Sequence, residues 1–215
     1  GNGRDSGHVR IYQNTNGTWT KIGDDIDGEA TLDNSGSAVS LSRDGSVVAI
    51  GAYGNDGNGR DSGHVRIYRN TNGTWTKIGD DIDGEATANY SGQSVSLSAD
   101  GSVVAIGAPY NDGSGTNSGH VRIYQNVDGS WTQVGSDIDG ETAGDRSGYS
   151  VSLSSDGSIV AIGAPWNDGN GTSRVHDSGH VRIYQNVGGS WTQVGSDIDG
   201  EAAGDTSGDT SEARA

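Results

Sequence analysis

Hydrophobic and polar positions along this chain recur with a fixed period. The string SGHVRIY occurs four times, at 6–12, 62–68, 118–124 and 178–184, so successive copies begin 56, 56 and 60 residues apart. Two other segments keep step with it, GTWTKIGDDIDGE at 17–29 and SGSAVSLSRDGSVVAIGA at 35–52. The first recurs with all four copies and the second with three. A fixed period of about this length is typical of solenoids and propellers.

Each period contains four segments with the pattern of a β-strand. In AVSLS the apolar Val39 and Leu41 alternate with serine, which indicates a strand with one buried face. VVAIGA is almost wholly apolar, which indicates a central strand covered on both faces. HVRIYQ and TWTKIG alternate again. We therefore expect four short strands in every repeat.

Turn dipeptides separate these strands. Asp-Gly joins the first strand to the second, at 44–45, 100–101 and 156–157. Asn-Gly, Asp-Gly or Gly-Gly joins the third to the fourth, at 16–17, 72–73, 128–129 and 188–189. Such dipeptides between alternating strands favour tight two-residue hairpin turns. No stretch combines the apolar spacing and the capping residues of a helix, so we expect almost no helix.

The pattern predicts an all-β protein, a β-propeller built of about four 56-residue, four-stranded antiparallel repeats. Small serines suit the crowded axis of such a fold. A tryptophan recurs in the fourth strand, where blades splay apart, and we expect it to pack between blades: Trp19, Trp75, Trp131 and Trp191. A β-solenoid-like stack of hairpins is the alternative. We interpret 1–215 as a single array with repeats at 1–56, 57–112, 113–172 and, in part, 173–215.

Counting strands suggests an array that does not close on itself. The chain begins with the third and fourth strands of a repeat, and 205–215 has neither the Val-x-Leu alternation nor the VVAIGA run of the first two. We expect a fragment of a larger propeller, or a chain completed by neighbouring chains in an oligomer or filament. A self-contained, four-bladed ring is the alternative.

Composition limits the partners. The 13 basic and 29 acidic residues give a net charge of −16, which argues against nucleic acid and anionic lipid as partners. The chain has no cysteine for disulfides or thiolate zinc sites, and no apolar run of about 18 residues that could insert into a membrane. Only 30% of positions are hydrophobic, which alone would suggest disorder, but the regular repeats indicate a folded chain.

Strand order places the long connections at one face of the disc, where binding residues are usual. These loops are rich in Asp and Asn, whose oxygens could bind a cation such as calcium, although the same residues also simply form turns. The candidate ligands are Asp56, Asn58, Asp61, Asp112, Asp168, Asn170 and Asp177. Asp25-x-Asp27-Gly28-Glu29 resembles half of an EF-hand loop but lacks its remaining ligands.

Aromatic residues vary between copies of the same loops. Rings beside Asn and Asp can stack on sugars, or can pack under a long loop; the candidate ligand-binding residues are Tyr53, Tyr110, Trp166, Tyr90 and Tyr149. Four asparagines lie in Asn-x-Ser/Thr and are possible glycosylation sites if the chain follows a eukaryotic secretory route: Asn16, Asn72, Asn89 and Asn170.

A histidine precedes the third strand in every repeat, at positions 8, 64, 120 and 180. Its parity is opposite to that of the Val and Ile pair, so we expect it at the surface. Asp61-Ser62-Gly63-His64 superficially resembles a hydrolase triad, but neighbours along an extended strand cannot face each other as nucleophile and base. We predict no catalytic residues and no enzymatic activity.

The strings SVSLS, VVAIGAP and SGHVRIY together resemble FG-GAP repeats, the blades of the integrin α-subunit propeller, in their divergent bacterial and marine form. The resemblance implies a propeller blade and an extracellular setting in adhesion or ligand binding. It also implies a calcium loop between the first and second strands, but here only Arg43-Asp44-Gly45 and its copies remain. One carboxylate cannot supply the six to eight oxygens that calcium takes, so we expect removal of calcium to change stability little.

The sequence thus favours a non-enzymatic extracellular repeat module for adhesion, or for structural assembly at a cell surface or in a secreted filament. Its partners would be other protein chains or surface glycans. A carbohydrate-binding, lectin-like propeller is the alternative, and an enzyme on a propeller scaffold finds no supporting residues.

Overall fold

The computed structural model describes residues 2–168, 178–201 and 206–208 of the 215. Every regular element in these ranges is a β-strand, as predicted. Candidate residues Asn170 and Asp177, and most of 205–215, lie outside the described residues.

The strands form one partial and three complete blades in the described chain. The partial blade consists of two strand pairs: β1 (His8–Val9) with β4 (Ile26–Asp27), and β2 (Tyr12–Thr15) with β3 (Thr18–Lys21). The next blade contains β5 (Ala38–Leu41), β6 (Val47–Ala52), β7 (His64–Thr71), β8 (Thr74–Lys77) and β9 (Ile82–Asp83). Its first copy contains β10 (Ser94–Leu97), β11 (Val103–Ala108), β12 (His120–Val127), β13 (Ser130–Gln133) and β14 (Ile138–Asp139). Its second copy contains β15 (Ser150–Leu153), β16 (Ile159–Ala164), β17 (His180–Val187), β18 (Ser190–Gln193) and β19 (Ile198–Asp199).

Each complete blade is an antiparallel meander of four strands. In the blade β5–β9, Ser40 lies opposite Ala49, which in turn lies opposite Ile67. A fifth short strand, β9, pairs with the start of β7, with His64 opposite Asp83. The sequence pattern predicts a loop, not a strand, at this Ile-Asp segment. The strand β9 pairs with β7 after β8 has ended, and from β9 the chain continues to the next blade.

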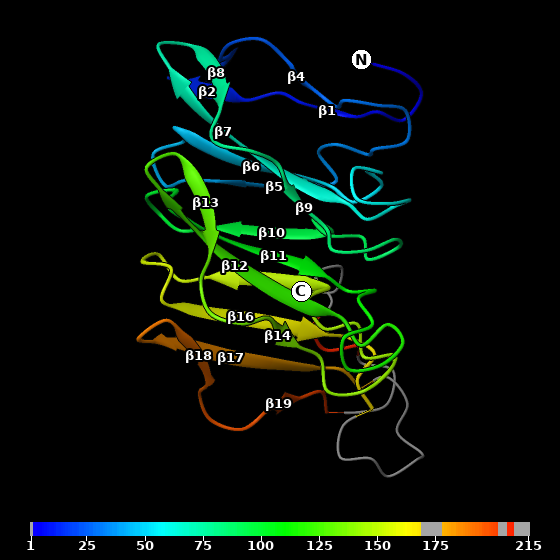
Figure 1. The fold of residues 1–215 in the computed structure, drawn as a ribbon. Coiled ribbons are helices and arrows are strands. Elements are labelled where there is room, and N and C mark those ends of the chain that lie inside the picture. The colour runs from blue at the N-terminus through cyan, green and yellow to red at the C-terminus, as the bar shows by residue number, and fades with distance from the viewer. Residues whose placement is uncertain (1, 169–177, 202–205, 209–215) are drawn as a thin grey trace.

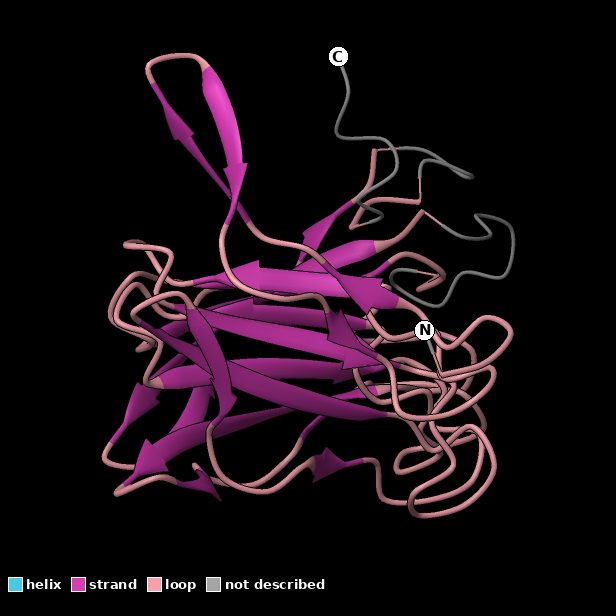
Figure 2. Ribbon diagram, turned by 90° about the horizontal axis from the view of Figure 1, so that it is seen from above, coloured by secondary structure: helices cyan, strands magenta, loops and turns pink. Residues whose placement is uncertain are grey.

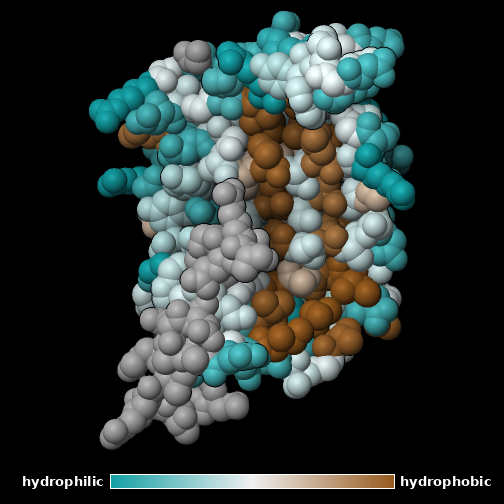
Figure 3. Space-filling model, turned by 180° about the vertical axis from the view of Figure 1, so that it is seen from behind, coloured by the Kyte–Doolittle hydropathy of each residue, from teal (hydrophilic) through white to brown (hydrophobic). Residues whose placement is uncertain are grey.

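The blades stack face to face in an open arc (Figure 1). The inner strands β5, β10 and β15 lie side by side, and their alternation of Val or Leu with Ser gives the apolar bands on the rear face (Figure 3). This arrangement confirms the predicted β-propeller blades. The described blades do not close into a ring.

The apolar core lies between blades rather than within one sheet. Val47 and Ala49 of β6 pack with Val104 and Ile106 of β11. Val48 and Ile50, on the other face of β6, pack against the partial blade. The prediction that VVAIGA is covered on both faces is therefore confirmed, and a chain with few hydrophobic residues still forms a continuous core.

The two kinds of hairpin turn differ. Asn72 and Gly73 both have positive φ, 53° and 88°, as the predicted two-residue turn requires. In contrast, residues 42–46 separate β5 from β6, and only Gly45 among them has positive φ, at 71°. Its amide donates to Ser42 O at 2.9 Å. The predicted two-residue turn is therefore wrong at Asp-Gly, where a longer turn ends at a left-handed glycine.

Polar side chains join neighbouring blades at their inner and outer strands. Trp131 Nε1 donates to Ile78 O at 2.9 Å, and Trp75 and Trp191 make the equivalent bond. On the inner strands, Leu97 N donates to Ser40 Oγ of the preceding blade at 3.0 Å. The predicted inter-blade role of the tryptophans is confirmed for these three, while Trp19 is 67% exposed because no described blade precedes it.

Two copies of the Asp-Gly turn provide a matched test of blade packing. Gly45 and Gly101 share a φ of 71°, but a Cβ at Gly45 meets nothing within 4 Å, whereas at Gly101 it lies 2.7 Å from Val47 Cβ. Both Gly→Ala variants carry the same backbone strain. We therefore expect Gly101→Ala to lower the free energy of unfolding by about 1–3 kcal/mol more than Gly45→Ala, measured by urea unfolding. Equal losses would contradict this packing.

Candidate functional site

The long loops gather at one end of the blades (Figure 2). In the blade β5–β9, Gly63 N donates to Asn55 O at 2.9 Å and Gly84 N donates to Gly63 O at 2.7 Å. Ser91 N then donates to Ser62 O at 3.0 Å. These bonds tie the loop after the second strand to the loop after the fourth, and the same bonds recur in the next blade. The long loops thus share one face, as the strand order predicted, and backbone hydrogen bonds tie them together.

Three tyrosines form a continuous contact across this face. The ring centroids of Tyr53 and Tyr90 are 5.8 Å apart, and those of Tyr90 and Tyr110 are 4.9 Å apart. Tyr53 follows β6 and Tyr110 follows β11, whereas Tyr90 comes from the connection between these blades. Burial raises the pKa of Tyr90 above its usual value, so its hydroxyl remains neutral.

An arginine continues the row into the next blade. The guanidinium carbon of Arg146 lies 4.8 Å from the ring centroid of Tyr110 and 4.2 Å from that of Trp166. Tyr149 then meets Trp166 edge to face, with centroids 4.9 Å apart. All five predicted aromatic residues are half-buried in one aromatic–arginine row, comprising Tyr53, Tyr90, Tyr110, Arg146, Trp166 and Tyr149.

Sequence reasoning missed Arg146 because only aromatic residues were considered. A signal was present: Arg146 occupies the repeat position of Tyr90, and Asn34 stands there in the preceding copy. All three residues have positive φ, at 54°, 53° and 55° respectively. The backbone at this position is therefore constant while its side chain changes, which is typical of a variable binding surface on a fixed scaffold.

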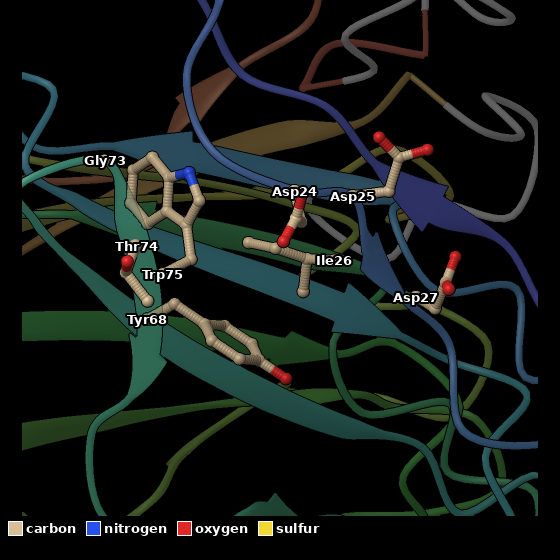
Figure 4. A pocket seen from close by; sticks show the side chains of 8 residues that line it. All are labelled: Asp24, Asp25, Ile26, Asp27, Tyr68, Gly73, Thr74 and Trp75. Carbon is tan, nitrogen blue, oxygen red and sulfur yellow. The ribbon is translucent and has the colours of Figure 1, made fainter.

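Apart from this row, a set of cavities lies between adjacent blades. Figure 4 shows the first, a pocket of about 260 Å³ with Asp24, Asp25 and Asp27 of the partial blade facing Tyr68 and Trp75 of the next. Equivalent pockets of about 250 and 260 Å³ lie beside Trp131 and Trp191. Their aromatic and acidic walls come from different blades.

Much of the polar surface of the first pocket is already used. Asp25 accepts hydrogen bonds from Lys21 Nζ at 2.7 Å and from Arg10 Nε at 2.8 Å, which lower its pKa to about 2. In Figure 4 its carboxylate points away from the two rings. Trp75 Nε1 donates a hydrogen bond to Ile22 O. The pocket thus contributes more to the blade interface than to ligand binding.

The repeated histidines are buried, so the prediction of a surface position is wrong for His64, His120 and His180. In a stacked blade both faces of the third strand are covered, and the face opposite Val and Ile packs against the preceding blade. His8, which no described blade precedes, is exposed. Burial lowers the pKa of all three buried imidazoles, that of His120 to about 4.

Each buried histidine is part of a triad across a blade interface. We define the first triad as Glu29, His64 and Asp81, the second as Glu85, His120 and Asp137, and the third as Glu141, His180 and Asp197. Within each triad, one nitrogen and two carboxylate oxygens lie within 4.8 Å of one another. Glu belongs to one blade, whereas His and Asp belong to the next.

A buried arginine lies beside each triad. Arg66 Nη2 donates to Asp27 O of the preceding blade at 2.9 Å, and its Nη1 lies 3.1 Å from Glu29 Oε1. Its guanidinium also lies 5.7 Å from the ring centroid of Tyr68. Arg122 repeats these contacts in the next blade. The arginine of SGHVRIY therefore links a blade to the preceding one, a role that the sequence pattern does not reveal.

Comparison with known proteins agrees with this architecture. The FG-GAP repeat profile matches residues 25–68, 81–124 and 136–183. The chain belongs to the FG-GAP repeat family. No curated protein matches it.

One solved structure shows the same fold as this FG-GAP chain at low sequence identity. A protein of Bacteroides uniformis described as a 6-phosphogluconolactonase superposes with a TM-score of 0.58 and 13% identity, over 89% of this chain and 48% of that one. A similarly described protein of Bacteroides fragilis gives a TM-score of 0.49 and 17% identity, over 75% and 38% of the two chains. The FG-GAP chain thus spans about half the length of the first protein.

The Asp-Gly turn of these FG-GAP repeats uses its single carboxylate internally. Asp44 Oδ1 accepts hydrogen bonds from Ser42 Oγ at 2.8 Å, Ser46 N at 2.9 Å and Ser46 Oγ at 2.7 Å. The bonds from Ser46 are the main cause of a pKa lowered to about 2. The carboxylate therefore shapes the turn.

The predicted loop ligands also hold the loops together. Asp56 Oδ1 accepts from Asp61 N at 2.8 Å, and Asp112 Oδ1 accepts from Asn117 N at 2.8 Å. Asn58 Nδ2 donates to Gly84 O at 2.9 Å. Among described residues, the carboxylates of this set, Asp168 included, belong to none of the three triads, and a cation at the set stays a prediction.

Two of the possible glycosylation sites are accessible. Asn16 and Asn72 lie at exposed hairpin turns. Asn89 is buried beneath the loop face, so the folded chain does not present its side chain to solvent. Asn170 is outside the described residues.

The Asp-Gly turns lead to a calcium prediction. Adding calcium to the metal-stripped protein should shift Tm by less than about 2 °C, because each turn carboxylate already accepts three or more hydrogen bonds. Thermal unfolding at matched ionic strength, with magnesium as the control, tests this. A rise of more than about 10 °C with calcium alone would contradict it.

Proposed function

We propose that this FG-GAP repeat protein is a non-enzymatic extracellular module for adhesion or for structural assembly at a cell surface, and that the aromatic–arginine row binds its partner. The row is the observation that carries the proposal. It runs over three blades, yet equivalent repeat positions hold different residues, such as Tyr90 and Arg146 or Tyr110 and Trp166. A repeated scaffold with one non-repeated surface is suited to recognise a particular ligand.

The chemistry of the row favours surface glycans. The accessible parts of these half-buried rings offer apolar surface for the C–H groups of a sugar, and Tyr hydroxyls and the Arg146 guanidinium offer hydrogen-bond donors. The stacked rings fix the guanidinium, so little side-chain entropy is lost when a ligand binds. Extended oligosaccharides suit the length of the row better than monosaccharides. This is the carbohydrate-binding form of the adhesion proposal.

The absence of enzymatic activity is part of the proposal. Ser62 Oγ donates to Asn55 O at 3.3 Å and accepts from Asn58 N at 3.2 Å, so its bonds hold a loop. His64 in the same string is buried within the blade interface. These contacts support a structural role for the Ser-Gly-His string.

The extracellular setting rests on the family, since FG-GAP repeats are typical of extracellular proteins. The net charge of −16 and the absence of cysteine are compatible with that setting. Within the described residues, none forms a helix of the length and apolarity needed to cross a membrane.

Glycan binding can be tested on an array and by calorimetry with the best oligosaccharide. Trp166→Ala should weaken binding at least tenfold, because it removes one stacking face and releases Arg146. Trp19→Ala is the matched control, since Trp19 is exposed but lies outside the row. Equal affinity in both variants, or no glycan bound by the parent protein, would contradict the carbohydrate proposal.

Structural assembly is the second candidate, and a different surface favours it. The face of β15–β19 turned away from β10–β14 is not covered by any described blade. There Ile198 is 53% exposed, whereas the equivalent Ile82 and Ile138 in the covered blades are 6% exposed. Val194, between β18 and β19, is also exposed. This face has the composition of an inter-blade surface and would accept the partial blade of a second copy.

Self-association through this face can be tested by light scattering over a range of concentrations. We expect the protein to associate with rising concentration, and Ile198→Asp to reduce this association strongly because it places a charge in an apolar contact. Thr76→Asp is the matched control, because it adds the same charge on the exposed strand β8, away from both the Ile198 face and the partial blade. A monomer at all concentrations would contradict assembly while leaving glycan binding open to its own test.

A further inference from the structure

The three triads present the same unusual geometry at every described blade interface. In the second triad, His120 Nδ1 lies 3.5 Å from Asp137 Oδ2 and 3.9 Å from Glu85 Oε2. In the first and third, the histidine Nδ1 lies 3.7 Å and 3.8 Å from its aspartate. A nitrogen and two carboxylate oxygens from two blades thus converge on one point.

The histidine is an independent sign of a ligand. The side chains of His64 and His120 are only 2% exposed, yet each directs Nδ1 toward carboxylates at or beyond the limit of a hydrogen bond. Buried polar groups are normally hydrogen-bonded, so this spacing needs an explanation. Ligand atoms around a tetrahedral ion with bonds of about 2.0–2.1 Å lie about 3.4 Å apart, close to the separations here.

Neighbouring cations distinguish the three triads. In the first, Lys77 Nζ lies 2.5 Å from Asp81 Oδ1 and competes with a metal for that carboxylate. In the third, Arg182 contacts both Glu141 and Asp197.

The second triad is the least obstructed. Gln133 replaces the lysine and donates to Asp137 Oδ1 at 2.6 Å, which leaves Oδ2 toward His120. Arg122 Nη1 lies 3.4 Å from Glu85 Oε1, while Oε2 faces the histidine and has one contact of 3.5 Å with Asn111 Nδ2. Each carboxylate therefore keeps one oxygen directed toward the imidazole.

We propose that Glu85, His120 and Asp137 bind a divalent transition metal of the zinc class, which links the blade β5–β9 to the blade β10–β14. Imidazole with two carboxylates suits zinc, cobalt or manganese better than calcium, which prefers oxygen ligands alone. Three protein ligands leave one tetrahedral position for water. Because Glu85 belongs to one blade and His120 to the next, the ion acts as an inter-blade staple.

Zinc titration of the metal-stripped protein by calorimetry tests the site. We expect about one tightly bound equivalent and a higher Tm with zinc. Glu85→Gln and Asp137→Asn should each weaken this binding at least tenfold and abolish most of the Tm rise. Both side chains are partly exposed, and circular dichroism of the metal-free variants checks that each folds.

Two matched variants separate this site from other zinc contacts. His8→Gln removes the exposed copy of the same histidine and should leave binding unchanged. Lys77→Gln gives the first triad the residue found in the second, and should add a further bound equivalent. Absence of zinc binding by the parent protein, unchanged affinity in Glu85→Gln or Asp137→Asn, or loss of binding in His8→Gln would overturn the proposal.

The metal-site proposal and the glycan proposal can be tested independently of each other. The triads lie within blade interfaces, whereas the aromatic–arginine row lies on the loop face and shares no residue with them. Glycan binding by the zinc-free protein, compared with that of the Trp166→Ala variant, therefore tests the row alone.

Discussion

The close approach of neighbouring blades is the constraint on which this fold depends. A Cβ at Gly107 would lie 2.0 Å from Gly148 O of the next blade, and the equivalent atom at Gly51 would lie 2.1 Å from Gly92 O. Only glycine permits such backbone proximity. The small spacing allows Val, Ala and Ile to fill the interfaces, which explains how a chain that is 30% hydrophobic forms a continuous core.

Features that depend on neighbours in sequence were predictable. Strand alternation and the two-residue turns at Asn72-Gly73 follow from local preferences, and four copies made the pattern unmistakable. The short strand β9 was missed because Ile82-Asp83 is too brief to alternate. The buried histidines were missed for another reason: strand parity shows which residues share a face but not that another blade covers the polar face.

The candidate site, too, could be predicted from the sequence only in part. Variation between copies was enough to select the five aromatic residues as candidates, because they change from repeat to repeat while the strands around them stay constant. Their arrangement in one row could not be derived, since it depends on how far each blade is rotated from the last. Arg146 joins the row through the faces of Tyr110 and Trp166, a contact between repeats that no single repeat contains.

Identical segments in different surroundings show where the chemistry of this protein originates. SGHVRIY is the same at 6–12 and 62–68, yet His8 is exposed and His64 is buried beside two carboxylates. Arg10 pairs with Asp25 of its own blade, whereas Arg66 reaches Glu29 of the preceding one. The heptapeptide therefore supplies the functional groups, but the stacking of blades sets their burial and their partners. Both the triads and the aromatic–arginine row are formed by residues of neighbouring blades. Substitutions that change the spacing between blades should therefore change the geometry of both, even where they replace no residue of either.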